Sequence, residues 1–249
     1  MPTSFGAICT DFYVNQKLSL RMDLPSNRES VLDMFDRVRK ELPGMDRFRR
    51  HEGELALESP EQASQYSWLA LRRTAVRSGW VNPESLDQAY KLHRLILDVA
   101  PYFLSISPLD VEFVELVFGF DLQAERNRNE VVFEALLGNS PLASLVDLGR
   151  ESVLEAQPYI GFGLNEQCDL QGFVEVKTRT STGEIATGRF DDEPISVYLT
   201  VRKYGSLKTI EEFGTIFGKL AGHIERLAEE RVVPNVVMPL REAIHSRPG

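Results

Sequence analysis

The side chains best suited to chemistry in this sequence are arginines, because a guanidinium group forms bidentate contacts with carboxylates and phosphates. Six of them lie in two strand-like stretches that we expect to be antiparallel neighbours: Arg47, Arg49, Arg50, Arg72, Arg73 and Arg77. Their convergence would give the chain a local anion-binding surface. The predicted anion-binding residues, which include a histidine from the helix that follows, are Arg49, Arg50, Arg72, Arg73, Arg77 and His93.

A plainer interpretation of the same arginines is that they pair with nearby acids on the solvated face of an antiparallel sheet. The acids available for such pairs are Asp46, Glu52, Glu54 and Glu58. Nucleic acid is not expected as a partner, because the formal net charge of -9 repels polyphosphate. Residues 71–76 also lack the stacking aromatic side chains of an RNA-recognition sheet. An anionic small molecule or an acidic protein surface therefore remains the expected ligand of the arginines.

Three glycines recur at every fourth position of a predicted long helix, at Gly214, Gly218 and Gly222. Each glycine inside a helix costs about 1 kcal/mol relative to alanine, so a stripe of them indicates a close approach by another backbone. That backbone belongs either to the same chain or to a second copy of it. The stripe is therefore the predicted surface for close packing or self-association.

No catalytic motif is present in the sequence. The pair Gly161 and Gly163 lacks the third glycine and the helix start of a dinucleotide-binding loop, and the signatures of nucleotide hydrolases, serine hydrolases and zinc proteases are missing. The four histidines are far apart in the sequence, so no metal site is predicted. Cys9 and Cys168 have no histidine nearby and are expected to be inert thiols. We therefore expect no catalytic residue, no metal and no cofactor.

Hydrophobic periodicity and capping signals predict an α+β fold whose first half has the ferredoxin-like order β-α-β-β-α-β. The four expected strands are residues 17–24, 46–58, 66–76 and 109–120. One helix is expected to start near Asn27, with Ser26 as a capping hydroxyl, and the other at Asn82 and Pro83.

The second half is expected to contain a helix, a three-stranded antiparallel meander and a long packing helix. The helix runs from about Asn127, and the meander strands are residues 153–164, 170–180 and 195–204. A capping box at Thr209 precedes the long helix, whose apolar residues have helical spacing. Pro234 and Pro239 are expected to break that helix before a last short one.

The chain of 249 residues is long enough to bury a core, and 43% of its residues are hydrophobic. We expect a unit at 1–122, a second unit at 123–233 packed against it, and a short extension at 234–249. Two distant cysteines, no apolar segment of membrane-spanning length and no leader pattern predict a cytoplasmic protein without a membrane partner.

Two hypotheses about function follow from these observations. The first is a non-catalytic protein that acts by binding a protein partner or a second copy of itself. The alternative is an enzyme or small-ligand binder with an anionic ligand in a groove between the halves, where Arg72, Arg73 and His93 would meet it. A concave site with convergent polar groups would favour the second hypothesis, and a large apolar self-contact would favour the first.

Overall fold

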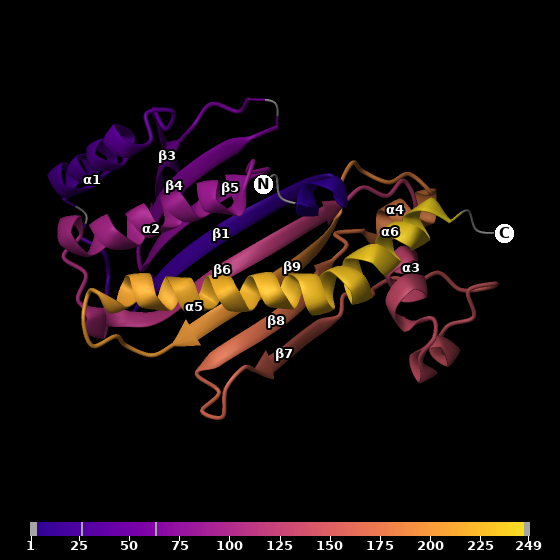
Figure 1. The fold of residues 1–249 in the computed structure, drawn as a ribbon. Coiled ribbons are helices and arrows are strands. Elements are labelled where there is room, and N and C mark those ends of the chain that lie inside the picture. The colour runs from indigo at the N-terminus through magenta and orange to yellow at the C-terminus, as the bar shows by residue number, and fades with distance from the viewer. Residues whose placement is uncertain (1–3, 26, 63, 247–249) are drawn as a thin grey trace.

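The computed structural model describes residues 4–25, 27–62 and 64–246, and it shows a mixed α+β chain built on one large antiparallel sheet (Figure 1). Within those residues the sheet has nine strands in the order β2-β3-β4-β5-β1-β6-β9-β8-β7. The strands are β1 (Asp11–Leu20), β2 (Arg47–His51), β3 (Glu54–Glu58), β4 (Tyr66–Arg72), β5 (Ala75–Val81), β6 (Val111–Leu122), β7 (Tyr159–Gly163), β8 (Leu170–Lys177) and β9 (Ile195–Tyr204).

Three helices cover the same face of this sheet: α1 (Arg28–Glu41), α2 (Leu86–Phe103) and α5 (Glu212–Leu227) (Figure 1). The shorter helical segments are Ser4–Ala7, Pro108–Asp110, α3 (Arg128–Val132), Phe133–Leu137, Pro141–Leu145, α4 (Thr182–Thr187), Ala228–Val237 and α6 (Met238–His245). None of the helices in the described part of the chain is long and apolar enough to cross a bilayer.

Alternation along the central strand β1 decides which side chains enter the core. Phe12, Val14 and Leu18 are buried beneath the helices, while Tyr13 and Lys17 point to the opposite face. Phe12 packs with Phe5, Phe118 and Phe120, each at a ring-centroid distance of 5.3 Å. We call the face opposite the helices the open face. The alternate side chains of each strand, such as Tyr13 and Lys17 of β1, lie on it.

The ferredoxin-like order is not confirmed, because two of the predicted strands each contain a tight turn. The stretch 46–58 folds into β2 and β3 around Glu52 and Gly53, and Gly53 has a φ of +69°, which glycine adopts without strain. The stretch 66–76 is likewise interrupted at Arg73 and Thr74, beyond which β5 continues to Val81. The first strand also begins six residues earlier than predicted, at Asp11 instead of Lys17.

The N-caps observed for α1 and α2 differ in part from the predicted ones. The Asn27 side chain accepts a hydrogen bond from the backbone N–H of Glu29 and caps α1, while the predicted Ser26 cap lies outside the described residues. Helix α2 is capped by Ser85, not by Asn82, and starts at Leu86. Asn82 instead has a φ of +48° and accepts a hydrogen bond from the N–H of Phe12.

The second half contains the antiparallel meander β7-β8-β9, and β9 pairs with β6 along its whole length. The sheet is therefore continuous across the predicted boundary at 122/123. Beyond α5, the chain stays helical through a wide-turned segment, Ala228–Val237, and on into α6. The predicted break at Pro234 and Pro239 is thus absent, because the wider turn accommodates Pro234 and α6 has Pro239 in its first turn.

Candidate functional site

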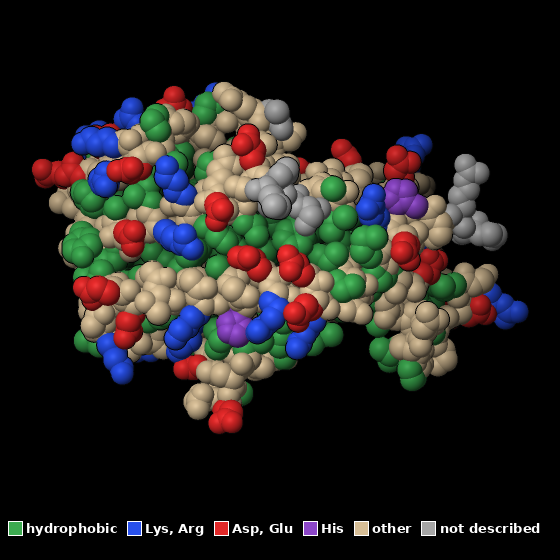
Figure 2. All heavy atoms as spheres, in the orientation of Figure 1, with side chains coloured by type: hydrophobic (Ala, Val, Ile, Leu, Met, Phe, Trp, Pro, Cys, Tyr) green, Lys and Arg blue, Asp and Glu red, His purple; other side chains and the backbone are tan. Residues whose placement is uncertain are grey.

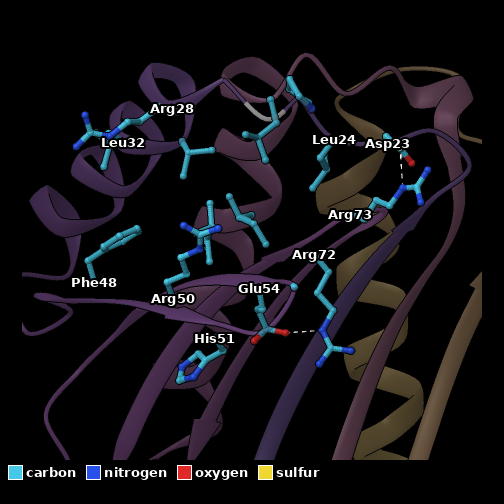
Figure 3. Close-up of a pocket in the computed structure, with 16 residues that line it drawn as sticks. Asp23, Leu24, Arg28, Leu32, Phe48, Arg50, His51, Glu54, Arg72 and Arg73 are labelled. Carbon is cyan, nitrogen blue, oxygen red and sulfur yellow. Dashed lines mark hydrogen bonds and ion pairs between the residues drawn. The ribbon is translucent and has the colours of Figure 1, made fainter.

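A cavity of about 970 Å³ lies between helix α1 and the outer strands β2, β3 and β4 (Figure 3). We call it the α1 cavity. Its apolar wall consists of Leu24, Val31, Leu32, Phe48, Leu55, Leu71 and Leu104. Its polar wall consists of Asp23, Arg28, Arg50, His51, Glu54, Arg72 and Arg73. A ligand seated there would meet an apolar surface and several guanidinium groups together.

The pleat of β2 places Arg50 in this cavity. Side chains of a strand alternate between faces, so Phe48 and Arg50 point to the helix-covered side while Arg49 points to the open face. Phe48 packs on Phe35 of α1, with ring centroids 5.8 Å apart. Figure 3 shows Arg50 reaching from β2 toward the helix. Arg50 is therefore a cation that extends over the apolar wall.

Four of the other five arginines of the two stretches have acidic partners, as the plainer interpretation expected. Arg73 contacts Asp23 at 2.9 Å between Nε and Oδ2, and Arg72 forms an ion pair with Glu54. Arg77 approaches Glu54 at 3.7 Å from the open face, where Arg49 lies 4.0 Å from Glu58. Among the described residues, Arg47 and Arg50 have no such pair, and of these two only Arg50 lines the α1 cavity.

His93 does not join the arginines. Its imidazole is fully buried under α2, where Nδ1 lies 2.8 Å from the Ser78 hydroxyl and Nε2 lies 3.2 Å from the Val14 carbonyl oxygen. Burial lowers the pKa of His93 to about 3, which keeps the ring neutral. The predicted meeting of Arg72, Arg73 and His93 in a groove between the halves is therefore not found.

The glycine stripe lies on the outer surface of α5. A Cβ atom built on Gly214, Gly218 or Gly222 would meet no atom within 4 Å, so no backbone of the described chain approaches the stripe. Figure 2 shows the helix-covered face, on which α5 forms a tan band of backbone and small side chains. The close packing within one chain is thus absent, and self-association through this stripe stays a prediction.

Nothing in the described residues favours covalent or metal chemistry. No group of three or more metal-ligating side chains gathers anywhere in the described part of the chain. The Cys9 thiol is mostly buried, and burial together with Asp121 and Asp11 raises its pKa to about 12, so it stays protonated at neutral pH. Cys168 is exposed in the turn between β7 and β8.

Comparison with known proteins assigns no family. No model of a known protein family matches the chain, and no curated protein matches its sequence. The crystal structure of the di-domain ARO/CYC BexL from the BE-7585A biosynthetic pathway overlaps 95% of this chain and 99% of its own, with 7% sequence identity and a TM-score of 0.22. A likeness at this level indicates neither a shared fold nor a shared activity.

Sequence reasoning found Arg50 but not the cavity. The missed signal is the alternation of Phe48 and Arg50 in a short strand that ends at His51, before the turn at Gly53, which places an aromatic ring and a guanidinium on one face. The apolar residues of the cavity come from α1, from the two hairpins, from the segment before α1 and from the end of α2, so their convergence depends on how these elements pack.

Proposed function

We propose that the chain is a non-catalytic binding protein whose α1 cavity takes an anionic ligand with an apolar body. The observation that carries the proposal is Arg50, an arginine without an ion-pair partner among the described residues, extended over a wall of leucines. Its free cysteines fit a reducing, cytoplasmic setting.

The apolar wall supports an amphipathic ligand rather than a bare anion. Two large apolar side chains of this cavity remain exposed, with Phe48 52% and Leu32 36% accessible. Covering apolar surface contributes roughly 25 cal/mol per Å². The cavity volume lies near the upper end of the range of about 300–1,000 Å³ that is usual for small-molecule sites.

Arg50 and Arg28 supply the charge for an anionic end group. Both line the cavity, and neither forms an ion pair within the described part of the chain. A hydrogen bond to a charged group contributes about 1.5–3 kcal/mol, against about 1 kcal/mol for a neutral one. The net charge of -9 repels anions at long range, so affinity must come from these local contacts and from the apolar wall.

Isothermal titration calorimetry with decanoate and with decanol, its uncharged counterpart, tests the proposal. We expect decanoate to bind at least tenfold more tightly than decanol, and acetate, which lacks the apolar body, to show no binding. Arg50→Gln should weaken decanoate binding about tenfold, which corresponds to about 1.4 kcal/mol. It should leave decanol binding unchanged.

The matched control is Arg49→Gln, which removes a neighbouring positive charge of the same strand from the opposite face of the sheet. Its decanoate affinity should equal that of the unmodified chain. Equal losses in the two variants would show a general charge effect and would contradict a site at Arg50. Absence of decanoate binding to the unmodified chain would overturn the proposal.

Self-association is a second candidate function, and the free edge of β7 favours it. Tyr159 and Ile160 on this edge are 62% and 61% exposed, and no charged residue interrupts the strand. The opposite edge strand, β2, contains three arginines and a histidine, which oppose pairing with an identical strand. A homodimer through β7 would extend the antiparallel sheet.

Sedimentation equilibrium distinguishes this edge from the glycine stripe. If β7 forms the contact, Ile160→Lys should give a monomer, because a charge on the neutral edge opposes pairing with a second copy. Gly218→Leu should then remain a dimer. The reverse outcome would assign the contact to the stripe, and a monomeric unmodified chain would exclude both surfaces.

A further inference from the structure

A second cavity, of about 440 Å³, lies on the open face, where β1 and β4 begin and β5 and β6 end. It is lined by Asp11, Tyr13, Asn15, Glu61, Ser64, Tyr66, Trp68, Val81 and Asp121. The alternation of β1 separates it from the helix-covered side, because Tyr13 and Asn15 point away from the buried Val14. This open-face cavity therefore shares no residue with the α1 cavity.

Three aromatic rings form its walls, and glycines hold two of them against the sheet. Tyr13 lies across its cross-strand partner Gly119, where an added Cβ would come within 2.0 Å of the ring. Trp68 lies across its partner Gly79 in the same way, at 2.4 Å. Rings that lie flat on the backbone turn their other face away from the sheet. Such faces carry negative electrostatic potential and attract cations. The Arg77 guanidinium already lies over the Trp68 ring, 5.4 Å from its centroid, so the rings left for a ligand are those of Tyr13 and Tyr66.

Three carboxylates surround these rings, and no lysine or arginine lines the cavity within the described residues. Asp121 accepts hydrogen bonds from Ser196 Oγ at 2.6 Å and from the Tyr13 hydroxyl at 3.3 Å. Asp11 accepts one from the Asn82 side chain at 2.6 Å. None of the three forms an ion pair in the described part of the chain, so their negative charge lacks a direct counter-ion.

Asn15 adds an unsatisfied acceptor to the same cavity. Its Oδ1 is covered and has no hydrogen-bond donor among the described residues. A buried acceptor without a donor costs about 1–3 kcal/mol, which a ligand N–H would recover. Aromatic faces, carboxylates without ion-pair partners and an amide oxygen without a donor are complementary to one chemical group, a protonated amine on an organic body.

We propose that the open-face cavity binds an organic ammonium ion of the primary alkylammonium class. The cation would lie against the rings of Tyr13 and Tyr66 and beside Trp68, with its charge facing Glu61 and the two aspartates. Cation–π contacts contribute about 0.5–1 kcal/mol at exposed sites and about 2 kcal/mol when desolvated. The proposal is independent of the α1 cavity and holds or fails separately from it.

Fluorescence of Trp68 reports directly on this site. The chain has two tryptophans, and Trp80 does not line this cavity, so Trp80→Phe leaves Trp68 as the sole tryptophan, which is excited selectively at wavelengths that tyrosine does not absorb. In that background, butylammonium chloride should change the Trp68 emission saturably. Butan-1-ol and sodium chloride at matched concentrations should not. A circular dichroism melt confirms that each variant is folded before titration.

Two substitutions then measure separately what a carboxylate and an aromatic ring contribute to binding. Glu61→Gln and Tyr66→Leu should each weaken butylammonium binding at least threefold, and the double variant about tenfold. Glu58→Gln, which removes an open-face carboxylate outside the cavity, should leave the affinity unchanged. An equal response to butan-1-ol, unchanged affinity in the double variant, or no saturable response to butylammonium would overturn the proposal.

Discussion

Replacing Arg128 with methionine is expected to lower the free energy of unfolding by about 3–5 kcal/mol, because the substitution leaves buried partners of a charged group unpaired. Arg128 is 0% exposed. Its Nε donates to the Thr178 carbonyl and to Thr180 Oγ1, both at 2.9 Å, and its Nη1 donates to the Asp191 carbonyl at 2.7 Å. Its Nη2 contacts Glu184 at 2.6 Å. One side chain thus ties α3 to the segment that joins β8 to β9.

Urea unfolding followed by circular dichroism measures this loss. Arg150→Met is the matched control, because Arg150 is 87% exposed and its contact with Asp147 is 3.8 Å long. We expect that variant to stay within about 0.5 kcal/mol of the unmodified chain. If the two variants lost equal stability, the buried network around Arg128 would contribute nothing specific.

The second large effect is a loss of stability in mild acid caused by His93. The folded chain holds this histidine neutral, with a pKa lowered to about 3, whereas the unfolded chain binds a proton near pH 6.5. The unfolded state therefore gains protons first as the pH falls. The contribution of the neutral His93 to stability is fully present above pH 6.5. Below that pH the free energy of unfolding decreases by about 1.4 kcal/mol per pH unit, toward pH 3.

The free energies of unfolding measured in urea at pH 7.5 and at pH 5.0 should differ by about 2 kcal/mol because of His93. The substitution His93→Asn removes the titrating ring, so its two unfolding free energies should lie close together even if both are lower than those of the unmodified chain. An unchanged difference between the two pH values in His93→Asn would show that another group causes the acid effect.

Glu184 acts in a lower pH window and should not obscure that comparison. Hydrogen bonds from the backbone N–H groups of Ser181 and Asp191 are the main reason that the pKa of Glu184 is lowered to about 2. Its contribution is present above about pH 4.5 and is lost as the pH falls toward 2. Measurements at pH 5.0 and above therefore exclude Glu184. Partial burial and Arg226 also lower the pKa of His223, so the comparison with His93→Asn is what assigns the acid effect to His93.

The sequence predicted correctly those helices and strands that depend on interactions between residues close together along the chain. The alternation of Ile195–Tyr204 predicted β9 with its observed bounds, and the side chain of Asn27 caps α1 where the sequence placed its start. Helical spacing likewise predicted the buried stripe of α5, which includes Phe213, Phe217 and Leu220. In each case neighbouring residues along the chain supply the physical cause, either a capping hydrogen bond or one apolar face.

Two-residue turns were the main source of error in the first half. Arg73 and Thr74 join β4 to β5 without a glycine or an asparagine, so no residue type marks the turn. Gly53 does mark the turn between β2 and β3, but charged residues surround it and mask the alternation. Treating each hairpin as one strand gave the ferredoxin-like order, which the nine-stranded sheet does not confirm.

The sequence by itself determined the residue types of the candidate sites, namely an arginine-rich hairpin in an acidic chain and a stripe of glycines on a helix. Only the tertiary structure decided which of them share a surface. Arg50 acquires its apolar surroundings because α1 packs beside β2, and the open-face cavity joins Asp11, Tyr66 and Asp121 from three strands. Such sites depend on strand register and helix placement, which arise from long-range packing and leave no local pattern in the sequence.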